Sequence, residues 1–238
     1  MMSTSYVTLT RQVGLMNEMQ SVANNLANMS TTGFRKEGVV FSEVVRSVEG
    51  PAGSVSLGAA RVRQTDLAQG PMTSTGGRFD FAIEGDGFFQ VNTPDGIRLT
   101  RAGVFTPNAA NELVNTDGHQ LLDLGGAPVF VPPDARGVAL SADGTLSADG
   151  RLLTQIGVFM PADQTDLQRE TGTLFSTAGD LLPVEGARLM QGFVEGSNVN
   201  PIHEISRMIE VQRSYELGQS FRDRESDRVS NMIDTIVG

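Results

Sequence analysis

Few residues of this chain have types and spacings that suit catalysis or metal binding. The two histidines, His119 and His203, lie far apart and form no ligand spacing such as HExxH. Asp-Gly occurs five times, but no occurrence carries the alternating acidic positions and final glutamate of an EF-hand. The segment GDGFF (85–89) has the glycines of a phosphate loop without the lysine, and a strand is expected after it.

No GxSxG nucleophile motif is present either. A pair of carboxylates placed for glycoside hydrolysis depends on folding, and 28 acidic residues leave that alternative open. We therefore expect a protein that is not an enzyme, with no catalytic residues, no metal site and no cofactor.

The composition narrows the classes of partner. The chain has 238 residues, of which 39% are hydrophobic, so it can bury a core as one large domain or two modest ones. A formal net charge of −10 argues against nucleic acid and anionic membranes as partners. No apolar run is long enough to insert into a membrane, and the N-terminal residues lack the pattern of a secretory signal peptide. Cysteine is absent, which excludes disulfides and thiolate chemistry.

The N-terminal residues have helical periodicity. Apolar residues at steps of four and three form one stripe, which comprises Met2, Tyr6, Leu9, Val13 and Met16. The stripe resumes at Met19, Val22, Leu26 and Met29, and Thr31–Gly33 ends it. We predict a helix within residues 1–30.

The C-terminal residues predict a second helix. Asn198, Asn200 and Pro201 open a segment from Ile202 to Gly238 that has no proline and one internal glycine. Its apolar residues include Ile205, Met208, Ile209, Tyr215, Phe221, Val229, Met232, Ile233 and Ile236. Each terminal helix is too long and too apolar along one stripe to stand alone in water. We expect the two to pair as a coiled-coil-like inner domain, because the entropy cost of closing the long intervening loop grows only logarithmically.

The middle of the chain predicts short strands. Phe79, Phe81 and Ile83 alternate with Asp80, Ala82 and Glu84, which is typical of a half-buried strand. The Asp-Gly pairs favour tight hairpin turns, and SADGTLSADG (141–150) suits two turns around a very short strand. We predict an α+β protein: an N-terminal helix (1–30), an extended connector (31–78), a central all-β domain (79–194) and a C-terminal helix (195–238).

Several segments together resemble one protein family. They are SVANNLANMSTTGF (21–34), which Arg11 precedes, DFAIEGDGFFQV (80–91), TPDGIRLTRAGVF (93–105), ELVNTDGHQL (112–121) and GFVEGSNVNPIHEISRMIEVQRSYEL (192–217). In this order they are similar to the flagellar basal-body rod family, which includes the hook protein and the hook-associated proteins. They cover about a third of the chain and include both ends and the centre. FRDRESDR (221–228) departs from the family by being more charged.

The resemblance implies a structural subunit of the bacterial flagellar rod, the axial drive shaft across the periplasm. The implied partners are other rod proteins, copies of this chain and the flagellar type III export apparatus, with export from the cytoplasm without a cleaved signal peptide. The short chain and Gly196 favour a proximal-rod subunit, with the distal rod protein as the alternative. An alternative of another class is a carbohydrate-binding, adhesive or hydrolytic β domain, but the chain has no tryptophan and only two tyrosines for a stacking surface.

The resemblance also implies which residues serve assembly. On the inner helices they are Leu9, Val22, Asn24, Asn25, Leu26, Asn28, Asn198, Asn200, Met208, Gln212, Tyr215, Met232 and Ile236. Asn24 and Asn28 share a helix face, with Asn25 beside them, and amides there can bond neighbouring helices without desolvating a charge. The alternative is that the asparagines only weaken the helix before its end. FSEVV (41–45) has, at Phe41 and Val45, the form of an export-gate motif, and an ordinary strand is the alternative.

Overall fold

The computed structural model describes residues 2–47 and 54–237, which form two compact units. The helical unit comprises Met1–Ala27, Glu37–Asp66 and Asn200–Gly238. The β unit comprises Asn28–Lys36 and Leu67–Val199. The α+β class is confirmed, since two terminal helices and many short strands are present. Neither helix is both long enough and apolar enough to cross a membrane, within the residues described.

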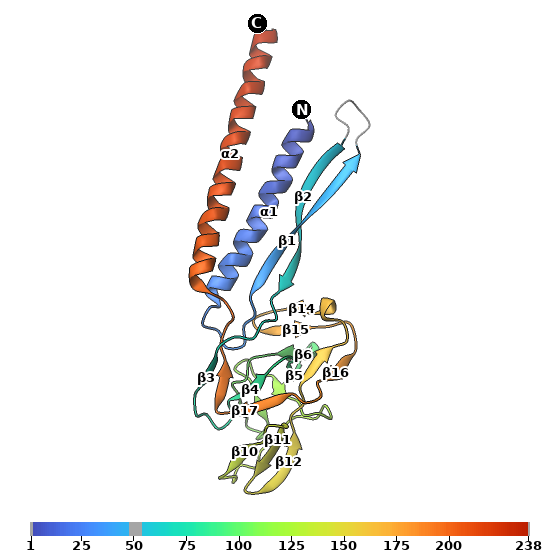
Figure 1. Cartoon of the computed structure of the whole chain (residues 1–238), viewed down its shortest axis with the longest axis vertical. Helices are drawn as coiled ribbons and strands as arrows, with labels where there is room; N and C mark the ends of the chain where they lie inside the picture. Colours follow the sequence, from blue (N-terminus) through green and yellow to red (C-terminus); the bar gives the residue numbers. More distant parts are fainter. Residues whose placement is uncertain (1, 48–53, 238) are drawn as a thin grey trace. The chain divides into compact units, whose positions relative to one another are not determined.

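The helical unit holds both helices and one long hairpin. Helix α1 (Met2–Ala27) and helix α2 (Pro201–Val237) lie side by side and run in opposite directions (Figure 1). The hairpin of β1 (Glu37–Ser47) and β2 (Ser54–Thr65) lies along α1 (Figure 1). Residues 31–78 were predicted to form an extended connector. In the structure Glu37–Asp66 belongs to the helical unit, and the residues on either side of it belong to the β unit.

Helix α2 begins at a well-formed N-cap. The Asn200 side-chain Oδ1 accepts hydrogen bonds from the backbone N–H groups of Ile202 (3.1 Å) and His203 (3.3 Å). Pro201 occupies the first helical position, where no backbone donor is required. The Glu204 N–H then makes the first intrahelical bond, to the carbonyl of Asn200 (3.1 Å). This sequence of residues explains why the helix starts where the asparagine-proline pair predicted.

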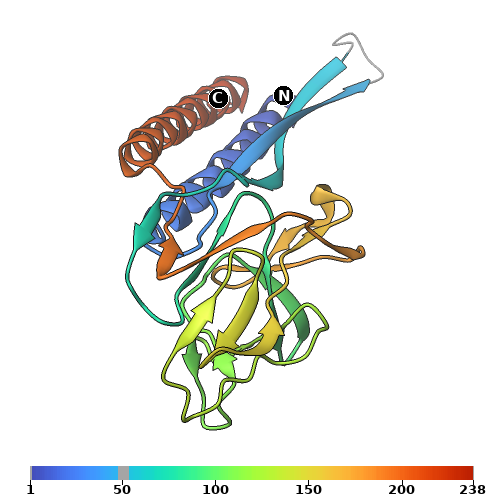
Figure 2. The ribbon, with the colours of Figure 1, turned by 60° about the horizontal axis from the view of Figure 1, so that its bottom comes forward.

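The β unit is built from antiparallel strands, which Figure 2 shows from a second side. The largest sheet has seven strands in the order β14-β15-β6-β5-β9-β8-β7; β10-β11-β12 form a second sheet, and β13-β16, β17-β4 and β18-β3 form pairs. The strands are β3 (Met72–Ser74), β4 (Phe81–Glu84), β5 (Phe89–Thr93), β6 (Gly96–Thr100), β7 (Thr106–Pro107), β8 (Leu113–Val114), β9 (Gln120–Leu121), β10 (Val138–Leu140), β11 (Thr145–Ala148), β12 (Arg151–Gln155), β13 (Phe159–Pro161), β14 (Gln168–Arg169), β15 (Leu174–Ser176), β16 (Leu181–Pro183), β17 (Arg188–Gln191) and β18 (Phe193–Glu195), with a 3₁₀ turn at Gln164–Asp166.

Two apolar clusters stabilise the β unit, and two consecutive phenylalanines contribute one ring to each cluster. Phe89 belongs to the larger cluster, where its ring meets that of Phe105 edge-on at 5.7 Å. Phe88 belongs to the smaller one, where its ring lies 5.5 Å from Phe175. Successive side chains of an extended chain point to opposite faces, so the Phe-Phe pair serves both clusters. The predicted strand near Phe79 is present as β4, but Ala82, expected to face outward, is also buried.

Four of the five Asp-Gly pairs lie in hairpin turns, as predicted, whereas Asp86-Gly87 connects β4 to β5, which do not pair with each other. All five glycines that follow aspartate have positive φ. At Asp149-Gly150 both residues have positive φ (51° and 77°), as a two-residue type I′ hairpin between β11 and β12 requires. Strand β11, with a turn on each side, is the short strand expected within SADGTLSADG.

Candidate functional site

The residues weighed for catalysis do not converge on a site. His119 lies in a turn, where its backbone N–H donates to Asn115 Oδ1 (2.8 Å), and His203 is exposed in the first turn of α2. Among the described residues, no three histidine or acidic side chains gather in a way that could hold a metal ion. Two other places stand out chemically: the polar contacts at the end of α1, and a buried ion cluster in the β unit.

Asn25 joins three elements of the helical unit. Its Oδ1 accepts from the Glu37 N–H (2.9 Å), and its Nδ2 donates to the Glu37 carbonyl (2.8 Å), so the amide binds β1 as a neighbouring strand would. The same Nδ2 lies 3.0 Å from Glu204 Oε2 of α2. Ser21 Oγ, one turn earlier, also donates to the Glu37 carbonyl (3.1 Å). Asn25 is therefore a fully buried connection between α1, β1 and α2.

The partners of Asn25 are only partly of the kind expected. Its side chain was expected to bond neighbouring helices, and Glu204 of α2 is such a partner, but the Glu37 backbone belongs to a strand. The reason is the β1–β2 hairpin, which sequence analysis did not recognise and which occupies this side of α1. Asn28 has a local role: its Oδ1 accepts from Thr31 Oγ1 (3.1 Å) in the turn after α1.

The seam between α1 and α2 is largely polar. Arg207 Nε donates to Glu18 Oε1 (2.6 Å), and Arg222 Nη1 donates to Gln12 Oε1 (3.2 Å). The partner with the lower number on α1 pairs with the partner with the higher number on α2, as two antiparallel helices require. Buried apolar residues of the two helices include Leu15, Val22 and Val211.

One part of the apolar stripe predicted on the N-terminal helix faces outward, whereas Val22 in its second half is buried. Leu9, Val13 and Met16 are 53%, 54% and 49% exposed. They were expected to pair with the C-terminal helix, but α2 packs on a different face, where Gln12 and Leu15 are buried. Helical spacing identifies residues that share a face and does not say which face is covered. Helix α2 likewise exposes Ile202, Ile205 and Ile209 at steps of three and four.

A groove of about 420 Å³ runs between the two helices. Its lining includes Arg11, Gln12, Leu15, Ser214, Leu217, Gly218 and Phe221. Gln12 Nε2 is buried there and has no hydrogen-bond partner among the described residues. An amide donor in this state is costly, so the groove is suited to an occupant that brings an acceptor.

The remaining predicted residues are dispersed. Asn24, Leu26, Met208 and Tyr215 are half-buried, whereas Gln212 and Met232 are exposed. The side chain of Ile236 lies outside the described residues. Phe41 and Val45 lie in β1, opposite Ala60 and Ser56 of β2, and their side chains are likewise outside the description.

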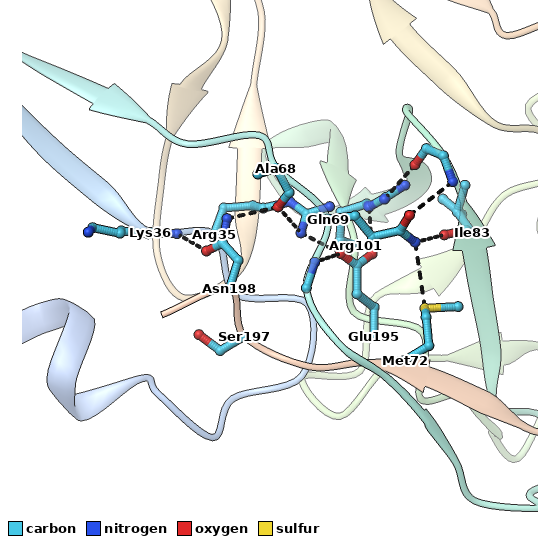
Figure 3. Close-up of polar contacts among 12 residues, drawn as sticks. Arg35, Lys36, Ala68, Gln69, Met72, Ile83, Arg101, Glu195, Ser197 and Asn198 are labelled. Atoms are coloured by element: carbon cyan, nitrogen blue, oxygen red, sulfur yellow. Dashed lines mark hydrogen bonds and ion pairs between the residues drawn. The ribbon is translucent and has the colours of Figure 1, made fainter. Parts of the chain in front are cut away.

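The second site is a buried ion cluster centred on Glu195, at the end of β18 (Figure 3). The Glu195 side chain is 1% exposed and lies between two guanidinium groups. Arg35 Nη1 donates to Glu195 Oε1, and Arg101 Nε lies 2.9 Å from Oε2. The backbone N–H of Gly70 also donates to Oε1 (2.8 Å). One carboxylate therefore contacts three segments that are distant in sequence.

Asn198 extends the cluster. Its Oδ1 accepts from the Lys36 N–H (2.6 Å), and its Nδ2 donates to the Ala68 carbonyl (2.9 Å). Arg35 Nη1 donates to the same carbonyl (3.0 Å). Backbone bonds run in parallel, from Gly33 N–H to the Glu195 carbonyl (2.7 Å) and from Asn198 N–H to the Phe34 carbonyl (3.3 Å). Figure 3 shows the bonds that link Lys36, Asn198, Ala68, Arg35 and Glu195.

The cluster carries an excess positive charge. Burial lowers the pKa of Arg101 from its ordinary value to about 10, and the nearby Arg35 adds to this effect, while Glu195 opposes it. That pKa is still well above 7, so the guanidinium is charged at neutral pH. Its Nη1 and Nη2 groups donate to the carbonyls of Gly87 (2.8 Å) and Gly85 (2.7 Å), respectively. Among the ion pairs of the described residues, Glu195 is the carboxylate in close contact with both guanidinium groups, and Asp86 acts on Arg101 from farther away.

Two further features position Arg35. The guanidinium of Arg169 lies between the rings of Phe34 (4.5 Å) and Phe175 (4.6 Å), and it donates to the Arg35 carbonyl. Gly33 has φ of +71°, and a Cβ there would lie 2.3 Å from the backbone nitrogen of Ala102. Only glycine meets both conditions, which explains the Gly in TTGF.

The sequence alone suggested no role for Arg35, Arg101 or Glu195, although Arg101 and Glu195 lie in segments that carried the family resemblance and Arg35 directly follows another. The signal was present as charged residues inside otherwise apolar or glycine-rich motifs: GFR (33–35), TRAG (100–103) and EGSN (195–198).

Comparison with known proteins agrees with this architecture. Residues 82–148 match the family model for the flagellar hook protein FlgE/F/G D1 domain, and residues 190–221 match that for the flagellar basal body rod FlgEFG protein C-terminal region. The chain is 35% identical to the flagellar basal-body rod protein FlgF of Caulobacter vibrioides, over 97% of this chain and 96% of that protein. It is 37% identical to FlgF of Mesorhizobium japonicum, over 91% and 90%. Its identity to FlgG of Bacillus subtilis is 32%, over 84% and 86%.

Replacing Asn25 with alanine should destabilise the helical unit. The change removes three buried hydrogen bonds, two to the Glu37 backbone and one to the Glu204 carboxylate, at a cost of ~1–3 kcal/mol for each buried bond that is lost. Asn17→Ala, at a half-buried position of the same helix, is the matched control. Urea unfolding followed by far-UV circular dichroism measures both. Equal midpoints for the two variants would contradict the role given to Asn25.

The charge balance at Glu195 predicts an asymmetric mutational response. Glu195→Gln leaves two uncompensated buried guanidinium groups and should cost ~3–5 kcal/mol of unfolding free energy. Arg35→Gln leaves one cation with one anion and should cost clearly less. Glu170→Gln, which removes the anion of the exposed Arg98–Glu170 pair, should be within ~1 kcal/mol of the wild type. Chemical denaturation of the three variants measures the order, and a costlier Arg35→Gln would refute it.

Proposed function

Because this chain belongs to the flagellar basal-body rod protein family, we propose that it is a structural subunit of the bacterial flagellar basal-body rod. The observation that carries the proposal is the outward-facing apolar stripe of α1, together with the groove beside it. Both features leave apolar helical surface exposed on this chain, which other chains can cover.

The stripe defines how the subunit packs. Leu9, Val13 and Met16 follow the four-three spacing of a coiled-coil seam, so a neighbouring helix is the natural occupant. That helix belongs to another rod protein or to a second copy of this chain. The groove beside Gln12 supplies a buried donor for an acceptor on the same neighbour. Contacts of this kind pair two different surfaces, and repetition of such a contact builds an open helical lattice.

The relatives named FlgF support a proximal position within the rod. They match at 33–37% identity over 91–98% of this chain, whereas relatives named FlgG match at 29–32% over 84%. The distal rod protein is the alternative within the family, and the greater coverage by FlgF does not favour it. The carbohydrate-active alternative has no support from these relatives.

Export through the flagellar type III apparatus is part of the same proposal. The residues proposed for the export gate are Phe41 and Val45, which lie in β1 of the folded chain. Their backbones are paired with β2, so the backbone of the motif is unpaired only before the hairpin forms. This order agrees with a chain that meets the gate unfolded and folds at its destination in the periplasmic rod.

A charge placed in the stripe tests the assembly surface. Val13→Glu should leave the fold intact, because the side chain is already half in solvent, and should prevent incorporation into the rod by removing an apolar contact worth ~1.5–3 kcal/mol and burying a charge. Leu152→Glu, at an exposed apolar residue of the β unit, is the control. The measurements are circular dichroism and swimming of a strain that carries only the variant. Normal swimming with Val13→Glu would refute the proposed surface.

A further inference from the structure

The chain passes between its two units four times. The crossings are the peptide bonds Ala27–Asn28, Lys36–Glu37, Asp66–Leu67 and Val199–Asn200. Any force that the covalent chain carries between the helices and the β unit passes through these four connections. How the load is divided among them depends on whether the connecting segments are joined to each other.

The Glu195 cluster lies at the β-unit side of the crossings. It binds residues 33–36, which precede one crossing, residues 68–70, which follow another, and residues 195–198, which precede the last. The first of these segments also follows the crossing at Ala27–Asn28 by only a few residues. All the connections thus reach the β unit at segments that one buried network holds together.

We propose that the Glu195 cluster is a load-sharing clasp, in which Glu195, Arg35 and Asn198 are positioning residues that make the connecting segments act as one mechanical junction. The inference rests on the proposed function, since a rod subunit must carry torque between its helices and its outer parts. It goes beyond that function by assigning the task to particular residues.

The chemistry of the cluster suits this task better than an apolar contact would. Buried ion pairs add little net stability, because desolvation offsets their attraction. They do fix geometry: the Glu195 carboxylate and the Asn198 amide each have set bonding directions, so the segments bind in one register. An apolar contact of equal area lets segments slide, because the hydrophobic effect is non-directional.

Arg101 and Arg169 anchor the clasp to the rest of the β unit. Arg101 links Glu195 to the carbonyls of Gly85 and Gly87, which adjoin strands β4 and β5 of the core. Arg169 holds Arg35 from strand β14. A pull on any one connecting segment is therefore transmitted into two separate parts of the β unit.

The first test is native-state hydrogen exchange on the full-length chain. Asn198→Ala removes two bridging bonds without disturbing any charge, so this variant should fold where Glu195→Gln fails. Exchange in residues 33–36, 67–71 and 195–199 should accelerate together by about tenfold, while Phe81–Val91 stays unchanged. Glu170→Gln should change neither region. Acceleration confined to residues near position 198, or equal acceleration in the core, would overturn the clasp.

The second test is swimming against load. A strain lacking this chain is complemented with the wild type, with Asn198→Ala, or with a core variant chosen from a Leu146 series to match its melting temperature. All should swim in dilute medium. In viscous medium Asn198→Ala should lose speed relative to the isostable core variant. Equal speeds at every viscosity would refute the load-bearing role, because stability alone would then explain the phenotype.

The two experiments distinguish a failure of the rod assignment from a failure of the clasp proposal. If the wild-type chain does not restore swimming, the rod assignment is wrong, and the exchange experiment still decides whether the segments are coupled. If it does restore swimming but the segments exchange independently, the rod assignment stands and the clasp is refuted.

Discussion

The way in which distant segments of the β unit are held together depends on one carboxylate. Glu195 is buried between Arg35 and Arg101 and also accepts a bond from the backbone of Gly70. Removing a charge from water is expensive unless geometry and hydrogen bonds compensate, so each partner must be in place. This requirement restricts which residue types can occupy the positions around the carboxylate. Gly33 is needed for close approach to Ala102 beside Arg101, and the pair Phe34 and Arg35 must meet Arg169.

The two units are stabilised in different ways. The β unit has an apolar core of the ordinary kind, with Phe81, Phe89 and Leu121 fully buried. In the helical unit the buried positions include Gln12, Glu18 and Asn25, while Leu9, Val13 and Met16 are exposed. Polar contacts such as these specify how the helices meet and contribute modest stability. The helical unit therefore keeps much of its apolar surface for contacts outside the chain.

The fold could be predicted where local rules decide it. The Asp-Gly turns, the strand at Phe81–Glu84 and the cap at Asn200 each follow from a few adjacent residues, and all are present. The hairpin β1–β2 was missed, because its strands are long and the residues between them gave no Asp-Gly or Asn-Gly signal. Without the hairpin, the partners of Asn25 could not be identified.

The ion cluster could not be predicted from the sequence, for a different reason. Arg35 and Glu195 are 160 residues apart, and no periodicity connects them. Charged residues in motifs also have a simpler explanation at the level of sequence, namely solvent exposure. What distinguishes these residues is burial, which only the folded chain reveals.

The incorrect prediction of which face of α1 packs on α2 has one physical origin. Periodicity groups residues by face, and a chain that assembles has two kinds of apolar face: one covered by itself and one covered by others. For α1, the regular four-three stripe of Leu9, Val13 and Met16 is the outer face, whereas the covered face mixes Gln12, Leu15 and Asn25. A contact within one chain forms at high effective concentration, so it can use polar groups that contribute little free energy. A contact between chains must also offset the lost translational and rotational freedom of the subunit, which favours the more apolar stripe. On this argument, the most regular stripe in such a chain marks the intermolecular contact, and the irregular polar face marks the intramolecular one.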